Sequence, residues 1–144
     1  LEALAERLGI ASRVTWLGGI PRAQHATLWP RLDCLVAPSR TTAGWVETYP
    51  VQILEAMGHG VTVVASDSGA LPEVIGKAGL IFRDGHPEGL TEALTRLLED
   101  GELRERLAAE GRRRVIAEYV DDAIARKTLA FWRAVREKMA EPRL

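Results

Sequence analysis

The chain has 144 residues, 47% hydrophobic and 27% charged, which is enough for one domain with a hydrophobic core. A formal net charge of −1 excludes a global positive field that would attract nucleic acid or a membrane surface. The lone cysteine, Cys34, excludes an intramolecular disulfide framework. Because a single thiol fits a reducing compartment, the composition predicts a cytoplasmic protein.

Apolar runs bounded by glycine or proline predict an alternation of helices and strands along most of the chain. In chain order these are helix 1–8, strand 13–17, helix 21–32, strand 33–37, helix 50–57, strand 61–65, short helix 71–75, strand 79–82, and helices 87–98, 102–119 and 121–138. Alternation of this kind predicts an α/β fold with right-handed crossovers between parallel strands.

The run 61–65 is apolar or β-branched at every position, which is typical of a strand buried on both faces of a parallel sheet. The prediction is therefore a Rossmann-like parallel sheet with helices on both faces and an all-α C-terminal end. Ligands of such sheets bind beyond the carboxyl ends of the strands. The loops 18–21, 39–50 and 66–72 follow predicted strands, so we expect them to meet at one crevice.

Two carboxylates flank the start of the helix predicted at 50–57. Glu47 precedes Pro50, and proline favours the first helical position, so Glu47 lies just outside the helix. Glu55 lies among Leu54 and Ala56 inside the helix, where a buried carboxylate requires a hydrogen-bond partner. Free N–H groups at a helix N-terminus bind phosphate, so acids on either side would suit a sugar nucleotide. On spacing alone, a capping acid at Glu47 and a lone structural acid at Glu55 are the favoured explanation of the pair.

Other features predict no further site. The three histidines, His25, His59 and His86, lack metal-ligand spacing, and the glycines after Ser68 do not have P-loop spacing. The arginines at 112–114 are interleaved with acids, which favours a solvated helix face. Cys34 is predicted to be core packing. Trp16, Trp29 and Trp132 are predicted to be core or interface anchors, whereas Trp45, in the loop before Glu47, is expected to line the side of the crevice that would face a second substrate, the acceptor.

These residues resemble a known family when they are taken in order. Glu47 and Glu55, followed by the string at 56–74 with its Glu-Ala-Met and Pro-Glu-Val motifs, resemble the C-terminal half of the family-4 retaining glycosyltransferases with the GT-B fold. The segment 14–18, the Ala37-Pro38-Ser39 strand end and the residues from Leu103 onward extend the resemblance over nearly the whole chain.

The resemblance implies a role for each candidate site residue. Glu47 would face the donor sugar and its phosphates at the reacting centre, and Glu55 would accept hydrogen bonds from the ribose hydroxyls. The other implied donor-binding residues are Thr48, Tyr49 and Val51 through their N–H groups toward the diphosphate, Gly69 and Ala70 beside the donor pocket, and Gly18 and Ile20 along the backbone that reads the nucleobase. Pro50 stands where the family often has glycine, and it removes one N–H donor.

The resemblance further implies a transferase that moves a sugar from a nucleotide-sugar donor to a hydroxyl acceptor with retention, without a metal or other cofactor. Residues 1–120 would form part of the nucleotide-sugar-binding domain, and 121–144 a C-terminal helix packing toward an N-terminal domain that precedes this sequence. That domain would carry the acceptor site, and a strand-loop-helix before residue 1 would carry the Arg and Lys that neutralise the diphosphate. The chain alone is therefore expected to be inactive. A peripheral membrane contact through the preceding domain stays open.

The sequence leaves two alternative kinds of function open, one catalytic and one non-catalytic. A GT-B sugar-nucleotide epimerase or a phosphorylase would use a similar donor site. A non-catalytic α/β nucleotide-binding or regulatory module would use the fold without the chemistry.

The resemblance also implies that 13–17 is a far-edge strand, separated from 33–37 by two strands outside this sequence, so direct pairing of 13–17 with 33–37 is not expected.

Overall fold

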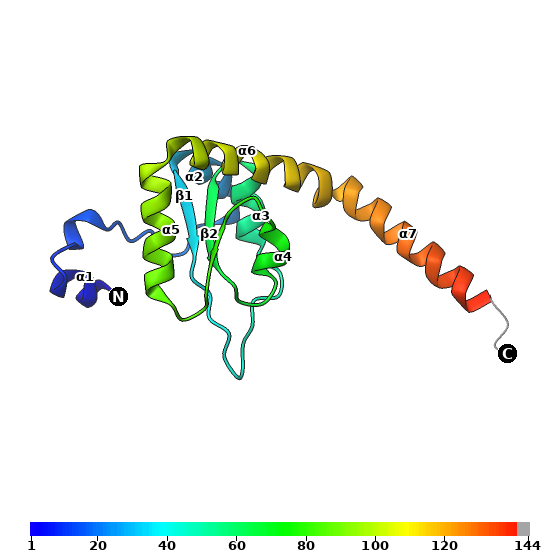
Figure 1. The fold of residues 1–144 in the computed structure, drawn as a ribbon, viewed down its shortest axis with the longest axis horizontal. Helices are drawn as coiled ribbons and strands as arrows, with labels where there is room; N and C mark the ends of the chain where they lie inside the picture. Colours follow the sequence, from blue (N-terminus) through cyan, green and yellow to red (C-terminus); the bar gives the residue numbers. More distant parts are fainter. Residues whose placement is uncertain (141–144) are drawn as a thin grey trace.

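The structure is a computed structural model in which residues 1–140 are described. Three parallel strands form one sheet in the order β1-β2-β3: β1 is Cys34–Ala37, β2 is Thr62–Ser66 and β3 is Leu80–Phe82. Figure 1 shows helices packed around this sheet and a long C-terminal helix that leaves the body of the molecule. The predicted Rossmann-like α/β class is confirmed.

The helices alternate with the strands along the chain. Their bounds are α1 Glu2–Arg7, α2 Arg22–Leu28, α3 Val51–Gly58, α4 Leu71–Ile75, α5 Pro87–Glu99, α6 Gly101–Glu118 and α7 Asp121–Ala140, with short 3-10 turns at Ala11–Arg13 and Trp29–Arg31. The helix predicted over 21–32 is therefore two pieces. Pro30 sits inside the second piece and cannot donate an α-helical hydrogen bond, so the last turn tightens to 3-10 geometry.

The centre of the sheet is β2, and it is buried along its whole length. Val63 points into one hydrophobic cluster with Ile53, Met57 and Ile75, whereas Val64 points into another that includes Phe82. Successive residues of a strand face opposite sides of a sheet, so both faces of β2 are covered by helices. The prediction of a strand buried on both faces is confirmed.

Helix α6 closes the end of the sheet where β2 begins. The Thr62 hydroxyl donates to the Arg104 carbonyl at 2.9 Å, which ties the start of β2 to this helix. Gly111 lies where α6 crosses α3, since a Cβ there would be 3.3 Å from Met57 Cγ. The strands therefore present their opposite, carboxyl ends to the loops that hold the candidate site residues.

The prediction of a strand at 13–17 is wrong. Val14 has an extended backbone, with φ −115° and ψ 126°, but within residues 1–140 no strand pairs with this segment. An extended segment becomes a strand only when a neighbouring backbone supplies the ladder hydrogen bonds, and β1 pairs with β2 alone. The expected absence of direct pairing between 13–17 and 33–37 is confirmed.

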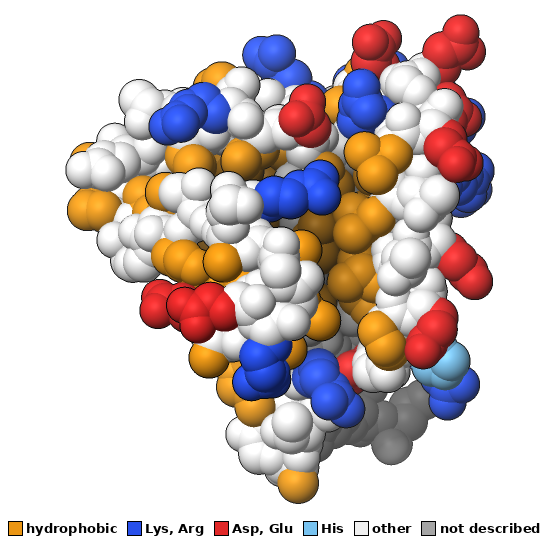
Figure 2. Space-filling view, turned by 90° about the vertical axis from the view of Figure 1, so that its left-hand side faces the viewer, with side chains coloured by type: hydrophobic (Ala, Val, Ile, Leu, Met, Phe, Trp, Pro, Cys, Tyr) orange, Lys and Arg blue, Asp and Glu red, His pale blue; other side chains and the backbone are white. Residues whose placement is uncertain are grey.

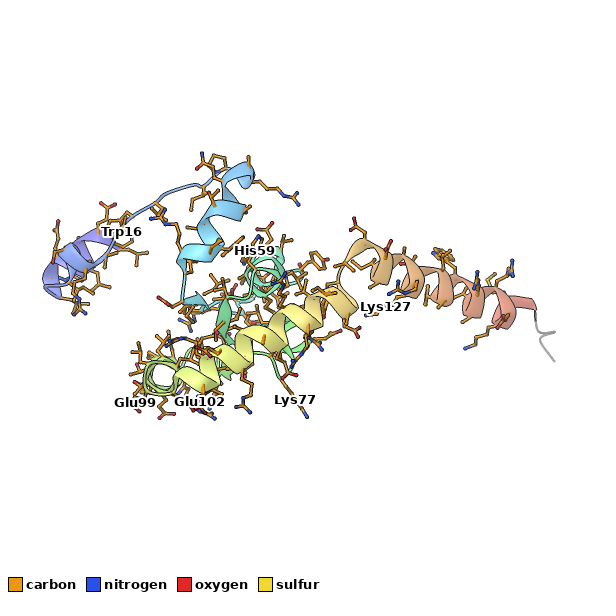
Figure 3. All side chains as sticks on the ribbon, turned by 90° about the horizontal axis from the view of Figure 1, so that it is seen from above. Trp16, His59, Lys77, Glu99, Glu102 and Lys127 are labelled. Atoms are coloured by element: carbon orange, nitrogen blue, oxygen red, sulfur yellow. The ribbon has the colours of Figure 1, made fainter. Side chains whose placement is uncertain are left out.

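The N-terminal segment stands apart from the sheet. Trp16 lies on it, and this tryptophan is 48% exposed rather than part of a core (Figure 3). Figure 2 looks at the side of the molecule that carries this segment and shows hydrophobic side chains in a hollow there. Trp29 is buried, as predicted, whereas Trp132 is 62% exposed on α7.

The C-terminal end is all α, as predicted. Tyr119 marks the corner between α6 and α7, where Lys127 pairs with Glu118 and lies 5.8 Å from the tyrosine ring centroid. Beyond this corner α7 projects away from the body (Figures 1 and 3). The prediction for 121–144 extends into residues 141–144, which lie outside the described residues. In the described chain no helix is long and apolar enough to span a lipid bilayer.

Candidate nucleotide-sugar site

The loop after β1 carries Glu47 and is fastened to the loop after β2. The Glu47 carbonyl accepts the Ala70 N–H at 2.8 Å. Gly69 has φ +54°, and a Cβ at that residue would lie 2.0 Å from the Glu47 carbonyl oxygen. The structure thus brings together three residues that the sequence assigned to one site. Glycine is required here because the two backbones touch and because the backbone is left-handed.

Hydroxyl groups attach the first part of the same loop to β2. The buried Ser66 hydroxyl donates to the Ser39 carbonyl at 2.5 Å, and the buried Ser68 hydroxyl lies 2.8 Å from the Thr41 hydroxyl. Side-chain oxygens at these positions satisfy loop backbone and hydroxyl groups that would otherwise lose water on burial. The loop from Ser39 to Glu47 is therefore held at both ends, by the last residue of β2 and by residues of the loop that follows β2.

Asp84, which follows β3, adds a third attachment. One of its carboxylate oxygens accepts the Thr41 N–H at 2.7 Å, and the other lies 3.6 Å from Arg40 Nε. The Asp84 N–H in turn donates to Asp67 Oδ1 at 2.6 Å. The loops after all three strands are therefore connected at one edge of the sheet. Of the three loops expected to meet, 39–50 and 66–72 do so, whereas 18–21 follows no strand and the loop after β3 takes the third place.

The N-terminus of α3 lies next to Glu47 in the chain. Thr48 and Tyr49 are exposed, and Pro50 is buried. The Val51 N–H donates to the Tyr49 carbonyl at 2.9 Å, so it would have to leave that partner before it could bind a phosphate. No backbone acceptor within residues 1–140 engages the N–H groups of Thr48 and Tyr49. Their predicted contact with a diphosphate stays a prediction.

Glu55 has the hydrogen-bond partner that its position required, and that partner is His25. His25 Nδ1 lies 2.8 Å from Glu55 Oε2. The Glu55 side chain is 22% exposed, so the carboxylate is less buried than the helix pattern predicts. Within the described residues, the hydrogen bonds leave Glu55 Oε1 without a protein partner. Two lone pairs of that oxygen are therefore available to hydroxyl donors.

His25 also connects Glu55 to the loop that contains Ile20. Its second ring nitrogen, Nε2, lies 3.1 Å from the Ile20 carbonyl. Trp29 packs one turn further along, edge-on to the imidazole, with ring centroids 6.0 Å apart. The hydrogen bonds to Glu55 and to Ile20 raise the pKa of His25 above its ordinary value of 6.5.

Sequence reasoning missed His25 because the two partners lie 30 residues apart and neither has a distinctive local pattern. The requirement for a partner at Glu55 was the one available signal. By contrast, the structure does not join Gly18 to the site: Gly18 is exposed with φ +62°, and none of the hydrogen bonds among residues 1–140 links it to Glu47 or Glu55. Its predicted contact with a nucleobase stays a prediction.

Three further kinds of feature could mark a site: metal-binding clusters, surface grooves and the cysteine. The described part of the chain contains no group of three His, Cys, Asp or Glu side chains that could hold a metal ion. A groove of about 720 Å³ is lined by residues of α7 such as Leu129, Trp132 and Met139, away from the strand ends. Cys34 is half-buried against the core cluster that contains Val64, which agrees with a packing role.

Comparison with known proteins identifies the class of domain. The fold superimposes on sucrose-phosphate synthase from Thermosynechococcus elongatus with a TM-score of 0.79 and 27% identity, covering 95% of this chain and 34% of that one. It also matches Anabaena HepE, solved in complex with UDP, with a TM-score of 0.80 and 22% identity, covering 92% of this chain and 35% of that one. This is the Rossmann-like fold of glycosyltransferase domains.

Residues 1–114 match the family model described as Glycosyl transferases group 1, and the chain belongs to that family. The chain is 33% identical over 137 residues to a GDP-mannose-dependent alpha-(1-6)-phosphatidylinositol monomannoside mannosyltransferase of Mycobacterium tuberculosis. It is 32% identical over 142 residues to an MMP alpha-(1->4)-mannosyltransferase of Mycolicibacterium hassiacum. The matches cover 92% and 96% of this chain but only 36% and 33% of those relatives.

Proposed function

We propose that this chain forms the donor-binding half of a retaining glycosyltransferase, which transfers a sugar from a nucleotide-sugar to an acceptor hydroxyl. The observation that supports this most directly is a pair of half-buried acids, with Glu47 in the loop before α3 and Glu55 at the fifth position of that helix. The relatives named for GDP-mannose and the fold neighbour solved with UDP bind nucleotides of this class.

Glu55 is suited to bind the ribose. Its Oε2 is engaged by His25, which orients the carboxylate, and Oε1 is free to accept from a sugar hydroxyl. An ionised carboxylate can only accept hydrogen bonds. It therefore favours a ligand with a diol, which donates, and disfavours a ligand group that can only accept. The loop carbonyl of Ile20, held by the same histidine, would lie with Gly18 along the nucleobase.

Glu47 is suited to act at the reacting sugar. Its backbone is fixed by Ala70, and Gly69 permits the close approach of the two loops. A group held this rigidly can favour one arrangement of the reacting atoms, which is how positioning contributes to a rate. The N–H groups of Thr48, Tyr49 and Val51 would bind the diphosphate, with Val51 released from the Tyr49 carbonyl on binding.

The chain spans about a third of the length of the relatives it matches. We propose that the acceptor site and the cationic groups for the diphosphate lie in the part of the relatives that it does not span. The apolar side chains that α7 exposes, among them Leu129, Phe131 and Trp132, would pack against that part. On this proposal residues 1–144 alone bind nucleotide weakly and transfer no sugar.

A donor panel tests the function. The intact protein that contains this sequence is incubated with GDP-mannose, UDP-glucose and other nucleotide-sugars, and donor turnover and products are measured. We expect Glu55→Ala to raise KM for the donor and Glu47→Ala to lower kcat more than it raises KM. Glu99→Ala, an exposed acid at the end of α5, is the matched control (Figure 3).

The products distinguish the alternatives. An altered sugar-nucleotide would indicate an epimerase, and a sugar phosphate formed with added phosphate would indicate a phosphorylase. Nucleotide binding without turnover of any donor would indicate a non-catalytic module. Normal turnover in both Glu47→Ala and Glu55→Ala would contradict the assigned site whichever reaction occurs.

A further inference from the structure

Among the described residues, His25 is the one side chain whose hydrogen bonds reach both regions assigned to the nucleotide. It lies on α2 and reaches Glu55 of α3 at 2.8 Å and the carbonyl of Ile20 at 3.1 Å. Ile20 and Glu55 are 35 residues apart in the sequence. Nothing else among the described hydrogen bonds connects the Ile20 loop to α3. The geometry of both candidate nucleotide contacts therefore depends on this imidazole.

Both partners of the imidazole are acceptors, and this fixes its protonation state. A carbonyl oxygen and a carboxylate oxygen can only accept, so each ring nitrogen must carry a proton to make its bond. A neutral imidazole has one N–H and can make only one of the two bonds, whereas the imidazolium makes both. The two contacts coexist only while His25 is positively charged.

The charged groups around His25 are few. Glu55 faces it from α3 and favours the charged form, while Arg22, one turn earlier on α2, opposes it. His59, which follows α3, does not compete for the carboxylate, because its Nδ1 lies 2.8 Å from the Glu55 backbone carbonyl. The imidazole is 31% exposed, so it can exchange protons with water.

We propose that His25 is a positioning residue that, in its charged form, holds the Ile20 loop and the Glu55 carboxylate together and thereby makes nucleotide affinity depend on pH. This inference rests on the proposed function, since it takes Glu55 and Ile20 as nucleotide contacts. Loss of the ring proton breaks one of the two bonds. Either the carboxylate loses its orientation or the loop loses its anchor, and in both cases the nucleotide binds more weakly.

The sign of the dependence follows from the same geometry. Affinity is highest where His25 is charged and falls as pH rises through the pKa of the imidazole. The positive charge also attracts the anionic diphosphate, which acts in the same direction. The terminal phosphate of a free nucleoside diphosphate also titrates, at about pH 6. Because that titration is common to every variant, the difference between variants reports the protein.

The test measures the dissociation constants of UDP and GDP by calorimetry between about pH 6 and about pH 9, a range that spans the titration of a histidine with a raised pKa. The intact protein is compared with His25→Gln and His25→Leu. His86→Gln is the matched control, because His86 is an exposed histidine beside an acid, Glu88, at the start of α5. Nitrogen-15 NMR of the imidazoles provides a readout that does not require nucleotide.

We expect about tenfold weaker nucleotide binding for His25→Leu at low pH, the loss typical of a removed hydrogen bond to a charged group, and no such loss for His86→Gln. The affinity of the wild type should fall toward that of His25→Leu as pH rises, whereas the His25 variants should lack this extra slope. In the NMR spectra, both nitrogens of His25 should carry protons near neutral pH, and Glu55→Gln should lower the pKa of His25.

Two results overturn the inference. One is a His25 variant that binds nucleotide with the affinity and pH slope of the wild type. The other is an imidazole that is neutral, with one protonated nitrogen, at a pH below its ordinary 6.5. If the wild type binds neither UDP nor GDP and turns over no donor of the panel, the proposed function fails. If the wild type binds nucleotide and either of the two results above is found, this inference alone fails, so the two failures are distinguishable.

Discussion

The contact between Gly69 and Glu47 gives the sharpest test of how the site is built. A Cβ at residue 69 would lie 2.0 Å from the Glu47 carbonyl oxygen and 2.8 Å from Val46 Cγ2. Since Cβ contacts below about 3 Å do not occur, Gly69→Ala forces one of the two backbones to move by about 1 Å. The movement also stretches the hydrogen bond from the Ala70 N–H to the same carbonyl, which is 2.8 Å long.

The expected loss has two parts. Gly69 has φ +54°, a left-handed conformation that costs a residue with a Cβ about 1–2 kcal/mol. The stretched hydrogen bond adds about 1 kcal/mol. We therefore expect Gly69→Ala to lower the free energy of unfolding by about 2–3 kcal/mol. Because displacement of a positioned group by about 1 Å can reduce a rate about 100-fold, sugar transfer should fall by about that factor.

Gly60→Ala separates the two parts, because Gly60 has φ +76° but no heavy atom within 4 Å of the position of its Cβ. It should show only the conformational cost of about 1–2 kcal/mol and leave transfer intact. Urea unfolding gives the stabilities, and donor turnover gives the rates. The reasoning is refuted if Gly69→Ala and Gly60→Ala lose equal stability and Gly69→Ala keeps its turnover, since the close approach would then be loose.

Three further predictions address single residues. Arg114 donates to the carbonyls of Val74 and Glu73 at 2.8 and 2.7 Å, so Arg114→Ala should lower the free energy of unfolding by about 1–3 kcal/mol. Arg113→Ala should change it by less than about 0.5 kcal/mol in the same urea titration, because Arg113 is exposed. The folded-state pKa of His25 is raised above 6.5, so its contribution to stability is complete below that pH and is lost as pH rises through the folded-state pKa. The urea midpoint of the wild type should accordingly fall relative to that of His25→Gln on going to alkaline pH, and parallel midpoints would contradict this. Ser68→Ala removes the hydroxyl 2.8 Å from the Thr41 hydroxyl and should cost about 1 kcal/mol and loosen the Glu47 loop, detectable as faster amide exchange at residues 41–47.

The order and type of the elements could be predicted from the sequence because those signals are local. The apolar run before Ser66 indicates a strand buried on both faces, and the structure confirms it. The predicted ends of α3 to α7 lie within one or two residues of the observed ones. The convergence of loops at the carboxyl ends of the strands follows from parallel pairing alone.

The failures occur where a residue depends on a distant neighbour. Residues 13–17 have the composition of a strand, but a strand needs a partner for its hydrogen bonds, and within the described chain none is beside it. The arginines at 112–114 look alike in sequence, yet Arg114 alone caps the end of α4, so the prediction of a uniformly solvated face is wrong for that residue.

In the candidate site, too, some features follow from local sequence and others only from long-range contacts. The sequence determined that Glu55 lies inside a helix and needs a hydrogen-bond partner, because burying a carboxylate without one is costly. Only the tertiary structure decided that this partner is His25, from a helix 30 residues earlier. Likewise, Gly69 reads as an ordinary loop glycine until the fold brings the Glu47 carbonyl against it. Local preferences fix which elements form, whereas the contacts that position these side chains join segments whose proximity no local pattern encodes.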